Sequence, residues 1–154
     1  MPKTTTSATT ATGEVCYDLP SPYIPHPATG LLHLPRFIAK IRKHLENTLP
    51  VSYQRNFTKG FDGFLCLHLG VEPNTIIAAV RESGSDTAAL DKRLLALFPA
   101  DTQTAKWNRE LVQRGMSEMG RAALTDAKKR MGISHRDDLL SFADMIDFDE
   151  GRIT

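Results

Sequence analysis

Apolar residues along the chain recur at the spacing expected of helices rather than strands. The first clear pattern has i, i+3, i+4, i+7, i+11 spacing and is formed by Leu34, Phe37, Ile38, Ile41 and Leu45. Pro35 suits the first turn of such a helix, and Pro50 disfavours helical angles at the residue before it. We therefore expect an amphipathic helix that begins at Leu34 and ends near Leu49.

Further helical segments follow, separated by glycines and prolines. A short apolar helix is expected from Phe64 to Leu69, stopped by Gly70, after an irregular stretch over 50–63. Two more helices are expected from Pro73 to just before Gly84, and from Ser85 or Asp86 to Pro99. Two further helices are expected from Asp101 or Thr102 to Gly115, and from Ser117 to Gly132. The last helix is expected to follow residues 134–137, which resemble a capping box. No segment shows sustained alternation between hairpin turns. The pattern predicts an all-α, compact single domain of five to seven helices.

The N-terminal region differs from the helical region in composition. Residues 1–13 are rich in threonine and predict a disordered tail. Residues 14–33 hold four prolines within ten positions, which predicts an extended, irregular strap along the helical body. The expected organisation is thus a 1–13 tail, a 14–33 Pro-rich strap and a 34–150 helical domain.

Composition narrows the class of protein without identifying its function. The chain has 154 residues, of which 41% are hydrophobic, and a formal net charge of +1, which argues against a strongly basic nucleic-acid binder. Two cysteines cannot form a disulfide framework, and we expect both to be reduced. The N-terminus lacks the apolar stretch of a signal peptide, and no window reaches the roughly 20 apolar residues of a membrane span. The expected location is therefore cytoplasmic.

Several segments with matching spacing resemble a known family. They are Asp18-Leu19 before the prolines, Leu34 to Arg42 (Leu-Pro-Arg-Phe-Ile-Ala-Lys-Ile-Arg), Leu45 to Leu49, Asp62-Gly63-Phe64-Leu65 running into Leu69-Gly70-Val71, and Phe148 to Arg152. In these the chain resembles a family of small bacterial proteins catalogued only as a domain of unknown function. The resemblance implies a helical fold and a bacterial origin, and it implies no reaction or cofactor. Ala39 departs from the family pattern, which has an aspartate there.

Charges are unevenly distributed along the chain. Arg36, Lys40 and Lys43 lie on the polar face of the first predicted helix, which suggests a solvated basic face or pairing with acids elsewhere. Residues 137–150 contain six acidic residues and no basic one. We favour pairing between this acidic segment and the basic helix, in exposed ion pairs that stabilise the fold little.

A second group of candidate residues surrounds a glycine-containing turn. Lys59 and Asp62 flank Gly60, and Asp62 is expected to cap the next helix or to pair with Lys59. The sequence Asp147 to Gly151 lacks the spacing of a calcium loop, and no histidine or cysteine spacing indicates a metal site. Cys66 and Trp107 are expected in the core. His68 is expected on a helix surface, with a role as general base as the alternative.

These residues suggest three functions. The first is a non-enzymatic module that binds a partner protein or a small anionic ligand, without a cofactor, through Arg36, Lys40, Lys43, Lys59, Asp62 and His68. The alternative is a small-molecule enzyme whose site combines Arg36, Lys40, Asp62 and His68, which requires these side chains to converge in a pocket. The third is a weak nucleic-acid binder, which requires the basic residues of 36–59 and 121–136 to share one surface. The oligomeric state is left open.

Overall fold

The computed structural model describes residues 9–10 and 13–154, and helices form its framework. Within these residues there are eight helices: α1 (Leu34–Leu45), α2 (Val51–Gln54), α3 (Phe61–Leu69), α4 (Pro73–Ser83), α5 (Thr87–Leu97), α6 (Thr104–Gln113), α7 (Glu118–Arg130) and α8 (Phe142–Asp149). Two-residue strands β1 (Thr9–Thr10) and β2 (Gly13–Glu14) pair antiparallel. The predicted all-α class is confirmed.

Helix boundaries differ from the sequence prediction at four places. The four-residue α2 follows Pro50 inside the stretch expected to be irregular, and it accounts for the helix beyond the predicted five to seven. α1 ends at Leu45 instead of near Leu49, and Asn47, two residues after this end, adopts a left-handed φ of 58°. α3 begins at Phe61, three residues earlier than expected, after Gly60. Ser141, and not the 134–137 stretch, caps α8 by accepting a hydrogen bond from the Asp144 amide at 3.1 Å.

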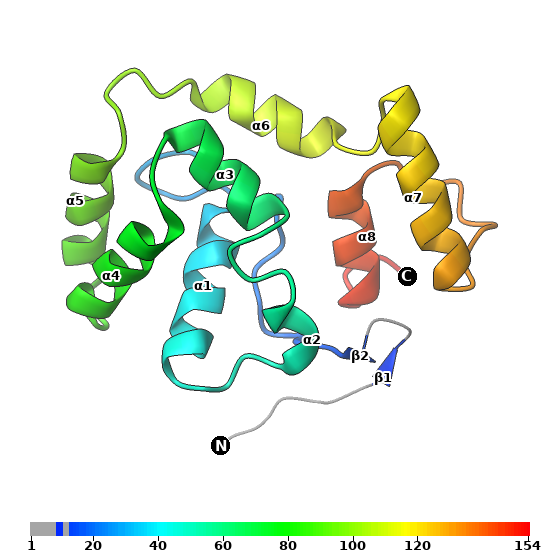
Figure 1. The fold of residues 1–154 in the computed structure, drawn as a ribbon, viewed down its shortest axis with the longest axis horizontal. Coiled ribbons are helices and arrows are strands. Elements are labelled where there is room, and N and C mark those ends of the chain that lie inside the picture. Colours follow the sequence, from blue (N-terminus) through cyan, green and yellow to red (C-terminus); the bar gives the residue numbers. More distant parts are fainter. Residues whose placement is uncertain (1–8, 11–12) are drawn as a thin grey trace.

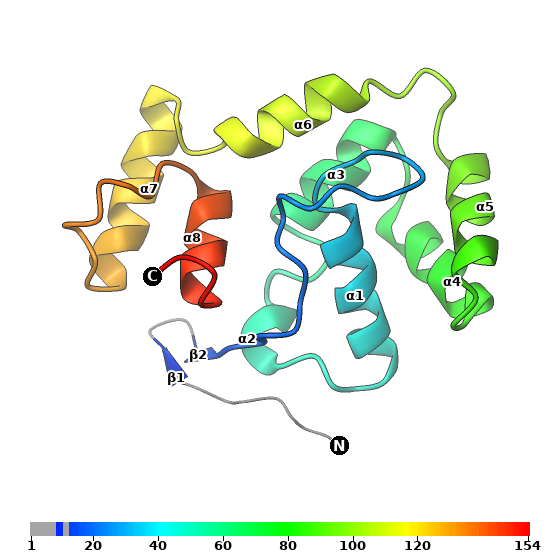
Figure 2. The same cartoon turned by 180° about the vertical axis from the view of Figure 1, so that it is seen from behind.

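The main hydrophobic core lies among α1, α3, α4, α5 and α6 (Figures 1 and 2). Its largest fully buried side chains include Trp107 and Phe37, together with several leucines and isoleucines. The Trp107 indole Nε1 donates to the Leu32 carbonyl at 2.9 Å, so the tryptophan also fixes the chain that enters α1. Cys66 is buried in this core too. The core positions predicted for Trp107 and Cys66 are confirmed.

A second, smaller hydrophobic cluster lies between α7 and α8, centred on Leu124, Leu139 and Met145. Figure 1 shows α7 and α8 side by side, apart from the main core, with α6 running along one edge and leading into α7. The molecule thus consists of a main body, formed by α1 and α3 to α6, and a C-terminal helix pair, formed by α7 and α8. The main body and the C-terminal helix pair thus face each other.

Residues 15–33 contain no helix and run along the main body. Leu19 and Leu31 are buried, and the His26 amide donates to the Leu31 carbonyl at 2.9 Å. Ser21 Oγ donates to Asp147 of α8 at 2.9 Å, so this segment also connects the main body to the C-terminal helix pair. Most of the predicted 1–13 tail lies outside the described residues.

Among the described residues, no single helix is both long and apolar enough to cross a membrane. α3 and α4 reach the required length and hydropathy only when taken together, and their axes meet at 94°.

Candidate functional site

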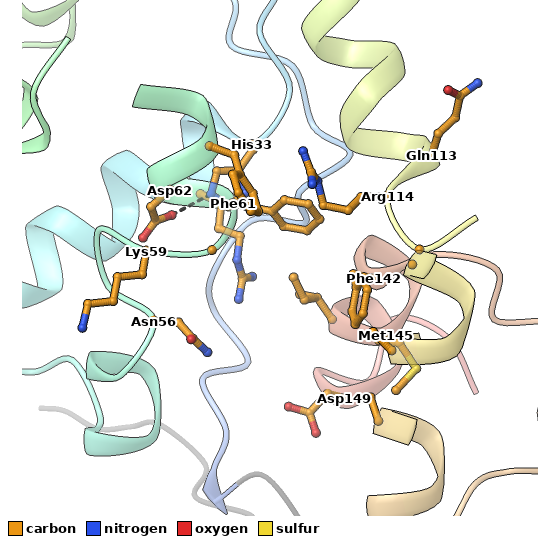
Figure 3. A pocket seen from close by; sticks show the side chains of 18 of the residues that line it. His33, Asn56, Lys59, Phe61, Asp62, Gln113, Arg114, Phe142, Met145 and Asp149 are labelled. Carbon is orange, nitrogen blue, oxygen red and sulfur yellow. Dashed lines mark hydrogen bonds and ion pairs between the residues drawn. The ribbon is translucent and has the colours of Figure 1, made fainter. Parts of the chain in front are cut away.

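A large cleft separates the main body from the C-terminal helix pair. Its volume is about 1220 Å³, and its walls come from α1, the α2–α3 region, the end of α6, α7 and α8. Figure 3 shows His33, Asp62 and Lys59 on one side of it, and Phe142, Met145 and Asp149 on the other. Ligand pockets in proteins commonly have volumes of about 300–1,000 Å³. The cleft is therefore large enough for a small organic molecule.

Three ionisable side chains are buried together at the wall of the main body. The Asp62 carboxylate accepts from His33 Nε2 at 2.6 Å through Oδ1 and from Lys40 Nζ at 2.8 Å through Oδ2. The Thr58 amide donates to the same Oδ2 at 3.0 Å. All three ionisable residues line the cleft, and their exposed fractions are 1% for His33, 5% for Lys40 and 0% for Asp62. The carboxylate is held by three donors, two from α1 and its N-cap residue and one from the turn before α3.

The local backbone places these side chains at the start of two helices. His33 precedes α1 with a left-handed φ of 73°, which costs a non-glycine residue about 1–2 kcal/mol. Asp62 is in the first turn of α3, where its side chain turns towards α1 instead of capping its own helix. The cap and the Lys59 partner predicted for Asp62 are thus both wrong: its partners are His33 and Lys40. A strained backbone at a buried charged cluster is characteristic of functional sites.

The surroundings determine which of these groups carry a proton. Burial alone would raise the pKa of Asp62, but the hydrogen bond from His33 and the charge of Lys40 outweigh it, so the pKa is lowered. Burial lowers the pKa of His33, and the charges of Lys40 and Arg36 lower it further, although Asp62 opposes the change. At neutral pH Asp62 is therefore ionised and the imidazole is neutral.

The neutral imidazole has an unused acceptor. Because Asp62 is ionised, His33 Nε2 must carry the ring proton that is donated to it. His33 Nδ1 then holds a lone pair, and this buried atom has no hydrogen-bond partner. Leaving a buried polar atom unpaired costs about 1–3 kcal/mol.

A second buried ion cluster joins the main body to the C-terminal helix pair. Arg36 donates to Glu150 through two parallel hydrogen bonds, NH1 to Oε1 at 2.8 Å and NH2 to Oε2 at 2.7 Å. Tyr53 OH and Arg152 NH2 also donate to this carboxylate, at 2.8 and 2.7 Å. Burial, followed by the charge of Glu150, raises the pKa of Tyr53, which stays protonated as the donor. The hydrogen-bonding groups of Arg36 and Glu150 are thus engaged within the protein, and both residues line the cleft.

The opposite wall of the cleft is mostly apolar, although Asp149 also lies on this side (Figure 3). It is formed mainly by methionine, phenylalanine and alanine side chains of α7, α8 and the turn before α7: Met116, Met119, Ala123, Phe142 and Met145. Met119 is 86% exposed. Methionine side chains are flexible and polarisable, and they adapt to differently shaped apolar partners. This wall suits an aliphatic or aromatic group.

Two exposed cations complete the site. Lys59 and Arg114 line the cleft, and within the described residues neither forms an ion pair. The Arg114 guanidinium lies over the Phe64 ring, 4.0 Å from its centroid, which orients it at the edge of the cleft. Glu110 and Asp149 also line the cleft, so the cations occupy only part of its rim.

The candidate residues predicted from sequence divide into two groups. Arg36, Lys40, Lys59 and Asp62 all line the cleft. Lys43 instead pairs with Asp18 at 2.8 Å. His68 lies against Trp107, with Nε2 3.1 Å from the Gln103 carbonyl, and is not among the residues that line the cleft. The full convergence that the enzyme alternative requires is absent, since His68 does not join the other three.

The exposure expected for the basic residues of the first helix is also corrected. Arg36 and Lys40 are buried, because each reaches a carboxylate from a distant segment. Pairing between the basic helix and the acidic 137–150 segment is confirmed for Arg36 with Glu150, but that pair is buried where an exposed one was expected. The acidic partner of Lys40 comes from α3 instead.

Sequence reasoning missed three residues of the site. His33 was a lone histidine before a helix, and nothing in its spacing indicated a carboxylate partner 29 positions away. Glu150 was one of six acids in its segment. Arg114 is followed by Gly115, whose φ of 106° turns the chain from α6 towards α7, and this glycine was the only local signal of a functional junction.

Two other kinds of site can be compared with the described residues. Within the described residues, no cluster of histidine, cysteine, aspartate and glutamate could hold a metal ion. Several basic residues required for nucleic-acid binding are already paired: Arg36 with Glu150, Lys40 with Asp62, Arg130 with Asp126, and Arg136 with Asp138. These pairs involve four of the eleven basic residues in 36–59 and 121–136.

Comparison with known proteins places the chain in a family. No curated protein and no solved structure shows significant similarity to it. Residues 21–152 match the family described as "Domain of unknown function (DUF5069)", which agrees with the resemblance seen in the sequence motifs. The match extends over most of the chain, and the chain belongs to this family.

Proposed function

We propose that the protein binds a small amphipathic anion in the cleft, with the charged end at Arg114 and Lys59 and the apolar end against α7 and α8. The observation that carries this proposal is an unpaired arginine at the edge of a cleft whose far wall is rich in methionine and phenylalanine. Ligand sites typically combine such an apolar lining with a few well-placed polar groups.

The charged end is assigned to Arg114 because its guanidinium is available and oriented. A guanidinium binds a carboxylate or phosphate through two parallel hydrogen bonds, which gives both affinity and direction. Lys59 supplies a second positive charge from the glycine turn. Arg36 and Lys40, which sequence analysis also proposed, have their charges neutralised by Glu150 and Asp62. Their role here is to shape the wall.

The apolar end is assigned to the C-terminal helix pair. Met119 and Met116 are unusually exposed for methionines, at 86% and 39%, and both face the cleft. Covering them with an alkyl chain would stabilise the complex by about 25 cal/mol for each Å² of apolar surface buried. The ligand class is thus a carboxylate or phosphate that carries an aliphatic or aromatic group.

Isothermal titration calorimetry with decanoate tests the proposal. We expect decanoate to bind, Arg114→Ala to weaken binding about tenfold or more, because a charge-assisted hydrogen bond is lost, and Lys59→Ala to weaken it less. Met119→Asp should weaken decanoate binding without affecting folding, since this side chain is largely exposed. Acetate, which lacks the chain, should bind much more weakly than decanoate.

Matched controls separate the site from general charge effects. Arg81→Ala on α4 and Lys92→Ala on α5 each remove one exposed cation from helices that do not line the cleft. Both should leave the decanoate Kd unchanged. The proposal fails if decanoate does not bind at millimolar concentration, or if the two control variants weaken binding as much as Arg114→Ala and Lys59→Ala do.

A further inference from the structure

We infer that His33 Nδ1 recognises a hydroxyl group on the ligand, so that the cleft selects hydroxylated amphipathic anions over their unsubstituted counterparts. This inference rests on the proposed function and names its ligand class more closely. His33 lines the cleft, is 1% exposed, and has an Nδ1 atom without a hydrogen-bond partner.

The imidazole is fixed in the orientation that leaves Nδ1 unpaired. Its Nε2 donates to Asp62, and Asp62 is held in place by Lys40 and by the Thr58 amide. If the ring flipped to present Nδ1 to the carboxylate, it would give up the 2.6 Å hydrogen bond from Nε2. The surroundings therefore hold the ring in place with Nδ1 buried and unpaired, in a residue that lines the cleft.

The chemistry of this acceptor defines its partner. The neutral imidazole offers one lone pair at Nδ1 and accepts from an O–H or N–H group. A carboxylate or phosphate dianion has no proton to donate, so the anionic end of the ligand cannot satisfy it. A hydroxyl group elsewhere on the same molecule can, and it would be bound in addition to the anionic end at Arg114.

Access to Nδ1 requires a small movement, because this atom is buried. The Phe61 ring packs against the imidazole, with centroids 5.5 Å apart, and Phe61 is partly exposed and lines the cleft. Rotation of Phe61 is the local movement that we expect to admit the hydroxyl. Phe61→Ala should therefore preserve or increase the selectivity for hydroxylated ligands.

The test compares decanoate with 2-, 3- and 10-hydroxydecanoate by calorimetry. A net hydrogen bond predicts that at least one hydroxylated isomer binds about fivefold more tightly than decanoate. Equal or weaker binding of all three isomers, with decanoate bound, overturns this inference and leaves the proposed function intact. If none of the four compounds binds, the proposed function fails and this inference fails with it.

His33→Gln identifies the atom responsible. Its side-chain amide nitrogen can donate to Asp62 in place of Nε2. Its one acceptor, Oε1, is bonded to the same carbon as that nitrogen and cannot also occupy the position of Nδ1. We expect the ratio of the decanoate Kd to the hydroxydecanoate Kd to fall to about one in this variant. The ratio should be unchanged in His68→Gln, which alters a histidine outside the cleft lining. An unchanged preference in folded His33→Gln overturns the assignment.

A measurement on the unaltered protein keeps the inference testable if His33→Gln does not fold. In ¹⁵N NMR of the histidine side chains, the Nδ1 resonance of His33 should shift when the preferred hydroxydecanoate is added, because that nitrogen gains a donor. Decanoate should leave it in place. Identical behaviour with the two ligands contradicts the inference.

Discussion

Arg36 and Glu150 are 114 positions apart in the chain and form a buried ion pair with two parallel hydrogen bonds of 2.8 and 2.7 Å. Arg36 belongs to α1 of the main body, and Glu150 directly follows α8. Arg36 also donates to the Pro20 carbonyl at 3.1 Å. One guanidinium thus ties the N-terminal segment, the main body and the C-terminal end together at the floor of the cleft.

Removing either partner of this pair should destabilise the protein strongly. Glu150→Gln leaves Arg36 as a buried charge without its carboxylate, and we expect a loss of about 3–5 kcal/mol in the free energy of unfolding. Urea denaturation followed by circular dichroism measures it. The matched control is Glu82→Gln, which breaks the exposed pair with Arg93 and should cost less than about 1 kcal/mol. Similar losses in the two variants would contradict the prediction.

The Lys40–Asp62 pair should behave as a coupled unit. Asp62→Asn leaves Lys40 buried beside a neutral amide, and Lys40→Met leaves Asp62 without its cation, so each single change should cost about 3–5 kcal/mol. The double variant should lose clearly less than the two single losses combined, because it leaves neither charge of this pair unpaired. A double-mutant cycle from urea unfolding gives the coupling energy. Simple additivity would show that the two residues do not depend on each other.

Stability should fall on mild acidification because two histidines are buried in neutral form. Burial lowers the pKa of His26 and of His33 from the ordinary 6.5, so below that pH the unfolded chain binds more protons than the folded one. We expect the free energy of unfolding to decrease from pH 7 to pH 5. Asp62 affects stability only at lower pH, because its pKa in the folded protein lies below 3.8. The stability that ionised Asp62 contributes is lost only as the pH falls through that folded pKa.

Urea unfolding at pH 7, 6 and 5 measures this dependence, and one variant isolates part of it. His33→Gln removes a group that resists protonation, so its loss of stability over this range should be smaller than that of the unaltered protein. His68→Gln should keep the full dependence. If His33→Gln lost as much stability between pH 7 and 5 as the unaltered protein, protonation of His33 would not be the cause of the loss.

Gly115 should tolerate substitution poorly because of both its backbone and its neighbours. Its φ is +106°, and a Cβ added there would lie 3.2 Å from the Phe142 ring and 3.3 Å from the Phe142 nitrogen. Gly132 also has a positive φ, +74°, but a Cβ there would meet nothing within 4 Å. We expect Gly132→Ala to cost about 1–2 kcal/mol and Gly115→Ala clearly more. Equal losses in thermal or urea unfolding would show that contact with Phe142 is unimportant.

Both cysteines should be unreactive in the folded protein. Burial raises the pKa of Cys16 to about 11 and of Cys66 to about 12, so almost no thiolate exists at pH 8. Ellman's reagent should therefore react slowly with the native protein. After unfolding in urea, both thiols should react. Ser85→Cys places a thiol at an exposed position and should react at once. Rapid labelling of the unaltered protein at pH 8 would contradict the prediction.

Local rules predicted some elements well and others poorly. The α1 pattern from Leu34 to Ile41 is buried as expected, because apolar periodicity is a property of the segment itself. The start of α3 was misplaced, because Asp62 was interpreted as a cap for its own helix when it in fact binds residues of α1 and the residue before it. Arg36 and Lys40 were expected to be exposed, either solvated or in surface ion pairs, because nothing close in sequence indicates that they are buried against carboxylates of distant segments.

The sequence by itself determined the helical class, the apolar face of α1, the burial of Trp107 and Cys66, and four of the residues that line the cleft. These follow from periodicity and residue type, which act over one or two helical turns. Only the tertiary structure decided that Glu150 meets Arg36, that His33 joins Asp62 with an open Nδ1, and that His68 lies elsewhere. These relationships join residues 29 to 114 positions apart, and they depend on how helices pack, which no local pattern encodes.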